Sequence, residues 1–166
     1  MTKVEFLEHL KVFTEDAIKD IILQVRQQEN DKEPPPPRAA KVYLMRLVKN
    51  SSAQKAAPYI VHQLITGKDM QPEGDRGTAL ALVRSIFCVY NEDEQEGALS
   101  LLGLMERLRI ELLEKRVIAN QFQLSLQGDG LETLIYPDDT APYYNGEMLT
   151  TWQIPAVGRK VDFIHG

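Results

Sequence analysis

Apolar residues recur at two different spacings along the chain, and the spacing changes near residue 40. Over the first 28 residues they stand three or four positions apart, which predicts a helix over about residues 3–28. Thr2 followed by Glu5 has the spacing of a capping box at the start of such a helix. Thr14 is followed directly by two acids, which is the composition of a second helix start, so the segment fits either one helix or two.

From residue 41 the apolar period falls to two, which is typical of strands. KVYLMRLV (41–48), YIVHQLIT (59–66) and ALALVRSIFCVY (79–90) are rich in Val, Ile and aromatics, and turn-rich stretches separate them. The third has few polar interruptions, so we expect it at the centre of a sheet. QFQLSLQ (121–127) and MLTTWQIP (148–155) predict further strands, with GDG at 128–130 as a turn and YPDDTAPYYNGE as a long irregular loop.

The leucine-rich segment 94–117 predicts a helix with more apolar positions than one buried face can use. Its main stripe consists of Ala98, Leu101, Leu102, Met105, Leu108 and Leu112, and the stripe is widened by Leu99, Leu104, Ile110 and Leu113. Such a helix needs cover on more than one side, and we expect another subunit to supply part of it. Arg109 projects within the widened stripe, where it either extends to solvent or pairs with an acid across an interface.

The order of these elements predicts an α+β fold, with a mostly antiparallel sheet of about five strands packed against the long helix and an additional N-terminal helix. The chain divides into a helical segment (1–30), a proline-rich spacer (31–40), the α+β domain (41–157) and a polar tail (158–166). Four consecutive prolines impose an extended path on the spacer. It fits either a stiff connection or a ligand for an aromatic groove of a partner.

Composition and charge exclude several classes of protein. Of the 166 residues 43% are hydrophobic and 26% charged, and no apolar run approaches the roughly 18 residues of a membrane span. The N-terminus lacks the apolar core of a secretory signal, so we expect synthesis in a cytoplasm. The formal charge of −5 and the scattered basic residues argue against nucleic-acid binding. Cys88 is the single cysteine and lies within an apolar strand, which is typical of a small buried hydrophobe.

The stretch NEDEQEG contains Glu92, Asp93, Glu94 and Glu96, and these acids suggest a metal site at first sight. A calcium loop is excluded because Glu96 stands where the turn needs Gly, and Leu102 where a bidentate Glu is needed. The side chains of adjacent acids also point in different directions, so they do not converge on one metal ion. Acids at a helix start, by contrast, are stabilised by the helix dipole. The pattern therefore indicates a helix start, with Asn91 or Asp93 as the N-cap.

No other motif predicts catalysis. There is no phosphate-binding loop and no nucleophile elbow, and the three histidines lack zinc-type spacing. His62 alternates with apolar neighbours and is predicted to be a structural histidine. The acids of the later loops, Asp129, Asp138, Asp139 and Glu147, have turn chemistry. We therefore predict no catalytic residue, no metal and no cofactor.

The run APYIVHQLITGKDMQPEGDRGTALALVRSIFCVYNEDEQEGALSLLGLMERLRIELLEKRVIANQFQLS, with GEMLTTWQIPAV after it, resembles small tail-terminator (neck) proteins of long-tailed bacteriophages and prophages. The resemblance covers roughly residues 41–157 and lies in the layout: two strands, a short acidic turn, and a helix that feeds an alternating strand. Members of that family form a ring, usually hexameric, which ends tail-tube polymerisation and presents the surface for head attachment. The resemblance implies a structural protein of the virion neck, made in the host cytoplasm.

The partners implied by the resemblance are further copies of the chain, the tail-tube protein and a head-completion (connector) protein, without nucleic acid or membrane. Candidate contact residues fall on the 67–77 loop and on the long helix: Asp69, Glu73, Asp75, Arg76, Leu99, Leu104, Arg109 and Ile110. The other interpretations are a different head–tail completion component, an intracellular adaptor that binds a partner through the prolines, and a small acidic hydrolase.

Overall fold

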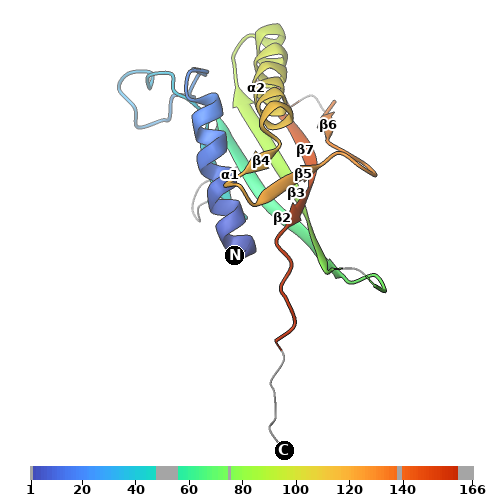
Figure 1. Ribbon diagram of the computed structural model, residues 1–166. Helices are drawn as coiled ribbons and strands as arrows, with labels where there is room; N and C mark the ends of the chain where they lie inside the picture. The colour runs from blue at the N-terminus through green and yellow to red at the C-terminus, as the bar shows by residue number, and fades with distance from the viewer. Residues whose placement is uncertain (1, 48–55, 75, 138–139, 161–166) are drawn as a thin grey trace, which may run out of the picture.

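The structure is a computed structural model that describes residues 2–47, 56–74, 76–137 and 140–160 (Figure 1). The described residues form two helices and seven strands, in the order α1 (Lys3–Ile18), β1 (Lys41–Leu44), β2 (Tyr59–Met70), β3 (Thr78–Tyr90), α2 (Glu94–Lys115), β4 (Val117–Ile118), β5 (Phe122–Ser125), β6 (Glu132–Ile135) and β7 (Tyr143–Ile154). The predicted α+β class, with a long helix and an N-terminal helix on a mostly antiparallel sheet, is confirmed.

The strands form one sheet in the order β1-β2-β3-β7-β5-β4, and β6 also pairs with β7. β3 and β7 are the centre, paired from Ala79 opposite Ile154 to Tyr90 opposite Tyr143. The β1–β2 pair is parallel and the others are antiparallel. Two short strands share the second edge of β7, since β6 pairs with its first half and β5 with its second half.

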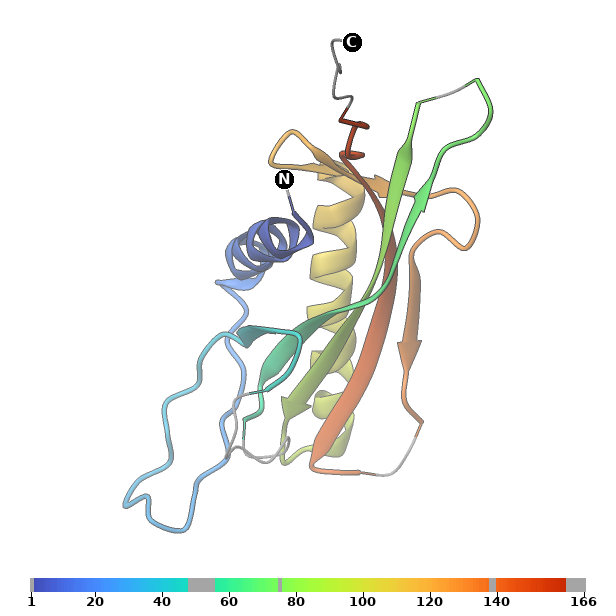
Figure 2. The same cartoon turned by 90° about the horizontal axis from the view of Figure 1, so that it is seen from below.

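Both helices cover the same face of this sheet (Figure 2). Phe6 of α1 is fully buried and its ring lies 5.1 Å from that of Phe122 and 5.2 Å from that of Trp152. α2 adds its own buried row: Leu101, Leu104, Met105, Leu108 and Leu112. The opposite face holds a smaller cluster of Tyr59, Val61, Cys88, Tyr90 and Tyr143. The main core therefore lies between the helices and the sheet.

The N-terminal helix is shorter than the predicted 3–28, because α1 ends at Ile18. Ile21 still packs against the core from a non-helical segment, so the apolar spacing continues after the helix has ended. Thr14 does not begin a second helix but lies inside α1, fully buried. The capping box of Thr2 and Glu5 is confirmed.

The predicted boundary between residues 1–30 and 41–157 does not separate two packing units. Phe6, Leu10 and Ile18 of α1 belong to the same core cluster as the sheet. The prolines lie in a projecting loop whose base is closed by two backbone hydrogen bonds between Leu23 and Arg38, of 2.8 and 3.0 Å. We call residues 24–37 the proline arm. The segment predicted as a spacer is thus a loop that extends from one domain (Figure 1).

Several strand boundaries differ from the predicted ones. β1 is shorter than 41–48, β2 extends into the predicted 67–77 loop as far as Met70, and β7 begins at Tyr143, inside the predicted irregular loop. Gly67 and Asp69 disfavour strands locally, but both are paired with β3. An added Cβ at Gly67 would meet only the end of the flexible Lys3 side chain of α1, which can move aside, so the contact does not by itself require glycine here.

Candidate interaction surfaces

The acids that precede α2 cap the helix, as predicted. The Asp93 side chain accepts hydrogen bonds from the backbone N–H groups of Gln95 and Glu96, at 3.0 and 2.9 Å. Asn91 accepts from the backbone N–H of Asp93, and the Tyr90 hydroxyl donates to Glu92. Asp93 and Asn91 therefore satisfy backbone donors at the helix start. In the described part of the chain no group of three or more His, Cys, Asp or Glu side chains is arranged to hold a metal ion.

His62 is a structural histidine, as predicted, and it links α1 to the sheet. Its ring is fully buried, with Nε2 2.8 Å from Thr14 Oγ1 and Nδ1 2.7 Å from Ser85 Oγ. Because the Thr14 hydroxyl donates to the Leu10 carbonyl, we infer that His62 donates through Nε2 and accepts at Nδ1. Burial lowers the pKa of His62 to about 3, so the ring stays neutral.

Cys88 is also buried, on the opposite face of the sheet. Burial raises the pKa of its thiol to about 11, although a contact with Tyr59 opposes the shift, and it raises the pKa of the Tyr59 phenol as well. A thiol with a raised pKa is a weak nucleophile. The prediction that Cys88 behaves as a small buried hydrophobe is confirmed.

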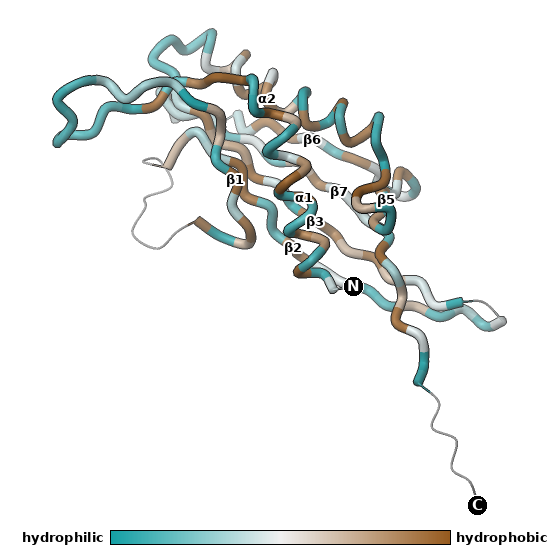
Figure 3. The backbone as a smooth tube through the Cα atoms, turned by 60° about the vertical axis from the view of Figure 1, so that its left-hand side comes forward, coloured by the Kyte–Doolittle hydropathy of each residue, from teal (hydrophilic) through white to brown (hydrophobic). Residues whose placement is uncertain are grey.

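The side of α2 that faces away from the core carries a row of residues in which exposed apolar side chains are interrupted by a glycine and two charged residues. Leu99 is 60% exposed, Leu102 42% and Ile110 43%. Figure 3 shows hydrophobic and hydrophilic segments alternating along α2. We call this row the outer stripe: Leu99, Leu102, Gly103, Glu106, Arg109, Ile110 and Leu113.

The candidate contact residues of α2 separate into two groups. Leu99, Ile110 and Arg109 lie on the outer stripe, where a second protein can reach them. Leu104 is fully buried in the core and is therefore not a surface residue, because it points to the sheet side of the helix. A count of leucines along a helix identifies an excess of apolar residues but not which of them face outward.

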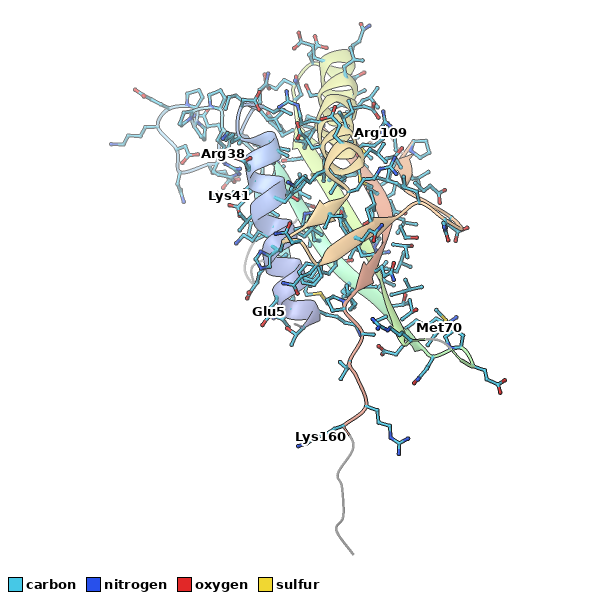
Figure 4. All side chains as sticks on the ribbon, in the orientation of Figure 1. Glu5, Arg38, Lys41, Met70, Arg109 and Lys160 are labelled. Carbon is cyan, nitrogen blue, oxygen red and sulfur yellow. The ribbon has the colours of Figure 1, made fainter. Side chains whose placement is uncertain are left out.

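Neither arrangement predicted for Arg109 is found, because its partner is an acid of the same helix. It projects from α2 (Figure 4), and its guanidinium donates twice to Glu106, through Nε and Nη2, at 2.8 Å each. This contact raises the pKa of Arg109 and lowers the pKa of Glu106. The two groups form a closed ion pair in the middle of the outer stripe.

The other candidate contact residues lie on a hairpin that extends beyond the rest of the sheet (Figure 2). We call residues 66–82 the protruding hairpin; its strands pair from Thr66 opposite Leu82 to Met70 opposite Thr78. Asp69, Glu73 and Arg76 are exposed on it. Asp75 lies outside the described residues. β2 ends at Met70, which is labelled in Figure 4 and shows where the hairpin lies.

One surface was not predicted, because its parts are far apart in the sequence. β6 is exposed at all four positions, with Leu134 49% and Ile135 43% exposed. Between β6 and the start of α2 lies a cavity of about 330 Å³, lined mainly by apolar groups that include Ala98, Ile135 and Tyr144. An acidic residue, Glu94, lies at this cavity as well. Only the pairing of β6 with β7 brings these groups together.

A tyrosine and arginine cluster joins the base of the proline arm to the sheet. Arg26 donates to the Tyr143 hydroxyl at 2.6 Å and its guanidinium lies 5.9 Å from the ring centroid of Tyr143. The rings of Tyr143 and Tyr90 lie 5.5 Å apart. Arg38 donates to the carbonyls of Ala39, Ala56 and Pro58. These contacts hold the arm in one orientation at its base.

No family model matches this chain, and a search of curated proteins finds no match either. Within the described residues, neither helix combines the length and apolarity that crossing a membrane requires.

Proposed function

We propose that this chain is a structural protein of the phage tail-terminator type, which forms a ring on a completed tail tube and presents a surface for head attachment. The proposal rests on the resemblance of residues 41–157 and on one feature of the structure, the protruding hairpin. A terminator has to contact the end of a polymer, and an exposed hairpin that extends from a well-packed body is suited to that task. The surfaces described above are consistent with an assembly protein.

The hairpin offers two means of contact with a tube protein. Its exposed residues Asp69, Glu73 and Arg76 carry both charges, which gives orientation to a docking partner. β1 pairs with β2 only from Tyr59 to His62, so the outer edge of β2 along the hairpin is not covered by β1. An uncovered edge can accept a strand of another protein by β-strand addition.

A ring also requires two unlike surfaces that meet between neighbours. β1 and the proline arm lie at one side of the sheet, whereas α2 and β6 lie toward the other (Figure 1). The second side carries the exposed apolar residues of the outer stripe, including Leu99 and Ile110, and the cavity beside β6. A head-to-tail contact between these two sides is therefore the ring contact that we propose.

The test is a native mass measurement of the protein alone and with a purified tail-tube protein. The proposal predicts a cyclic species, most simply of six subunits, that forms with the tube protein. It also predicts that Glu73→Lys together with Arg76→Glu weakens tube binding, while the same charge exchange at Glu8 and Lys11 of α1 does not. A chain that stays monomeric with tube protein, or that binds the tube equally well after the hairpin exchange, would contradict the proposal.

The proline arm favours a second candidate function, an intracellular adaptor. Pro34, Pro36 and Pro37 are exposed on a loop whose base is fixed, which is how a preformed proline ligand is presented to an aromatic groove. The adaptor function predicts that Pro35→Ala with Pro36→Ala abolishes binding of a partner while folding stays intact. A ring-forming terminator should assemble on its tube with these prolines replaced.

A further inference from the structure

The outer stripe of α2 has the residue spacing of a coiled-coil seam. Leu99, Leu102, Glu106, Arg109 and Leu113 follow one another at intervals of three, four, three and four residues. All five are at least partly exposed, and Leu113 also packs in part against the core. A helix with such a seam is suited to pack lengthwise against another helix.

The seam is complementary to a second copy of itself that runs in the opposite direction. About a midpoint between Arg107 and Leu108, Leu102 is exchanged with Leu113, and Glu106 is exchanged with Arg109. Two such helices placed antiparallel therefore bring leucine against leucine and glutamate against arginine. A parallel arrangement would bring Glu106 against Glu106 and Arg109 against Arg109, and like charges repel one another.

The flank of the seam fits in the same way. Ile110 projects from the stripe and is 43% exposed. At Gly103 an added Cβ would meet no heavy atom within 4 Å, so open space lies over this position. In the antiparallel arrangement Ile110 stands at the level of residue 105 of the other copy, two residues from Gly103, and the missing side chain of Gly103 leaves room beside it.

We propose that α2 pairs with α2 of a second copy in an antiparallel, two-fold arrangement centred between Arg107 and Leu108. The Glu106–Arg109 pairs of the two copies then form a network of four alternating charges, flanked on both sides by Leu102–Leu113 contacts. One helix pair is smaller than a standard protein interface, so the dimer forms at high protein concentration and dissociates on dilution.

This contact differs from the proposed ring contact, because it joins like surfaces and closes at two copies. It covers the same apolar stripe that the ring uses, so a two-fold dimer would keep free protein from forming rings before a tube is present. That role rests on the proposed function, whereas the helix pairing itself does not. Dimers and rings are distinguished by mass.

Cysteine cross-linking tests the geometry directly. Leu102→Cys protein is mixed with Leu113→Cys protein and oxidised with glutathione disulfide, and we expect a cross-linked dimer that contains one copy of each. Either variant alone should give little dimer, because the two copies of residue 102 lie 11 residues apart along the helix axis, roughly 16 Å. Val4→Cys with Val12→Cys on α1 is the matched control.

A charge exchange provides an independent readout of the same contact. Glu106→Arg and Arg109→Glu should each give a monomer at concentrations where the unmodified protein dimerises, since each brings four like charges together. A mixture of the two variants should recover a dimer of one copy each, and so should the double exchange E106R/R109E. Circular dichroism checks that the variants fold. The proposal is overturned if the mixed cysteine variants do not cross-link, or if the single charge variants dimerise like the unmodified protein.

The two results are separable from those of the ring test. A protein that cross-links at residues 102 and 113 but forms no ring with tube protein keeps the helix pairing and loses the terminator function. A protein that forms the ring but does not cross-link keeps the terminator function and loses the helix pairing.

Discussion

The two helices lie on the same face of the same sheet, yet they are covered to very different extents. α1 contributes Phe6, Leu10 and Ile18 to the core and is tied to β2 and β3 by the buried Thr14–His62–Ser85 hydrogen bonds. Its exposed apolar residues, Val4 and Val12, lie eight residues apart. In α2 the exposed apolar residues lie in one row beside a closed ion pair.

The difference shows which part of the molecule is complete within one chain. Single exposed apolar residues are ordinary on protein surfaces, whereas neighbouring ones such as Leu99 and Leu102, about one helical turn apart, are typical of an interface. α1 is a stabilising element whose buried side chains all contact the domain itself. α2 stabilises the domain with one side and offers the other side to a partner.

The largest effect is expected when α1 loses its central aromatic residue. Phe6→Ala should lower the free energy of unfolding by about 3–5 kcal/mol, because Phe6 is fully buried between Phe122 and Trp152. The measurement is a urea unfolding curve. Val12→Ala, on the exposed side of α1, is the control, with a change of about 0.5 kcal/mol or less. A small effect of Phe6→Ala would mean that α1 is not part of the cooperative unit.

The second prediction concerns pH and the anchor of α1. The folded pKa of His62, about 3, lies below the unfolded value of about 6.5, so its neutral form stabilises the fold above pH 6.5 and this stability is lost as pH falls toward 3. His62→Gln cannot titrate at this position. Between pH 7 and pH 5 the unmodified protein should lose about 2 kcal/mol more than the variant.

Urea unfolding at both pH values gives the comparison, since carboxylates outside the network contribute equally to the two proteins. His9→Gln serves as the control, because His9 is an exposed histidine of α1 outside the Thr14–His62–Ser85 hydrogen bonds. Equal pH dependence in the unmodified and His62→Gln proteins would show that His62 is not held neutral in the folded state.

A smaller effect is expected at the start of α2. Asp93→Ala removes the acceptor for two backbone N–H groups and should cost about 1 kcal/mol, whereas Asp93→Asn keeps an N-cap and should cost much less. Thermal unfolding with and without magnesium or calcium completes the experiment. A rise of the midpoint with either ion, abolished by Asp93→Asn, would restore the metal-site interpretation of these acids.

The smallest effect on stability is expected on the outer stripe. Leu99→Gln with Ile110→Gln should change the free energy of unfolding by about 0.5 kcal/mol or less, since both side chains are largely exposed. The same variant should lose concentration-dependent self-association in analytical ultracentrifugation. Val4→Gln with Val12→Gln on α1 should leave both properties unchanged. If both double variants behave alike, the contrast between the helices is wrong.

The sequence predicts the elements of this fold better than their ends. Alternation identified β1, β2, β3, β5 and β7, but not the two-residue β4 or β6, which is exposed at all four positions. The acids before α2 identified its start because capping is a local interaction. The end of α1 was missed because Ile21 continues the apolar spacing from a segment that is no longer helical. Helical spacing reports which residues face the core, and a connecting segment that crosses the core edge gives the same signal.

The surfaces were predicted in part. The excess of apolar residues on the long helix is a local pattern, so the sequence could indicate an interface there. Leu104 was wrongly counted as a contact residue, although its spacing of three residues from Leu101 and four from Leu108 places it on the buried face. The cavity beside β6 could not be predicted at all, since β6, β7 and α2 meet only through long-range pairing.

The central β3–β7 pair also constrains how the chain folds. Its partners stand 53 to 75 residues apart, since Tyr90 pairs with Tyr143 and Ala79 with Ile154. The β2–β3 hairpin can form by closing a short loop, whereas β3 gains its second neighbour only after the long intervening segment has been ordered. During synthesis one edge of β3 therefore stays unpaired until β7 has been made. In this interval the new chain is most exposed to aggregation.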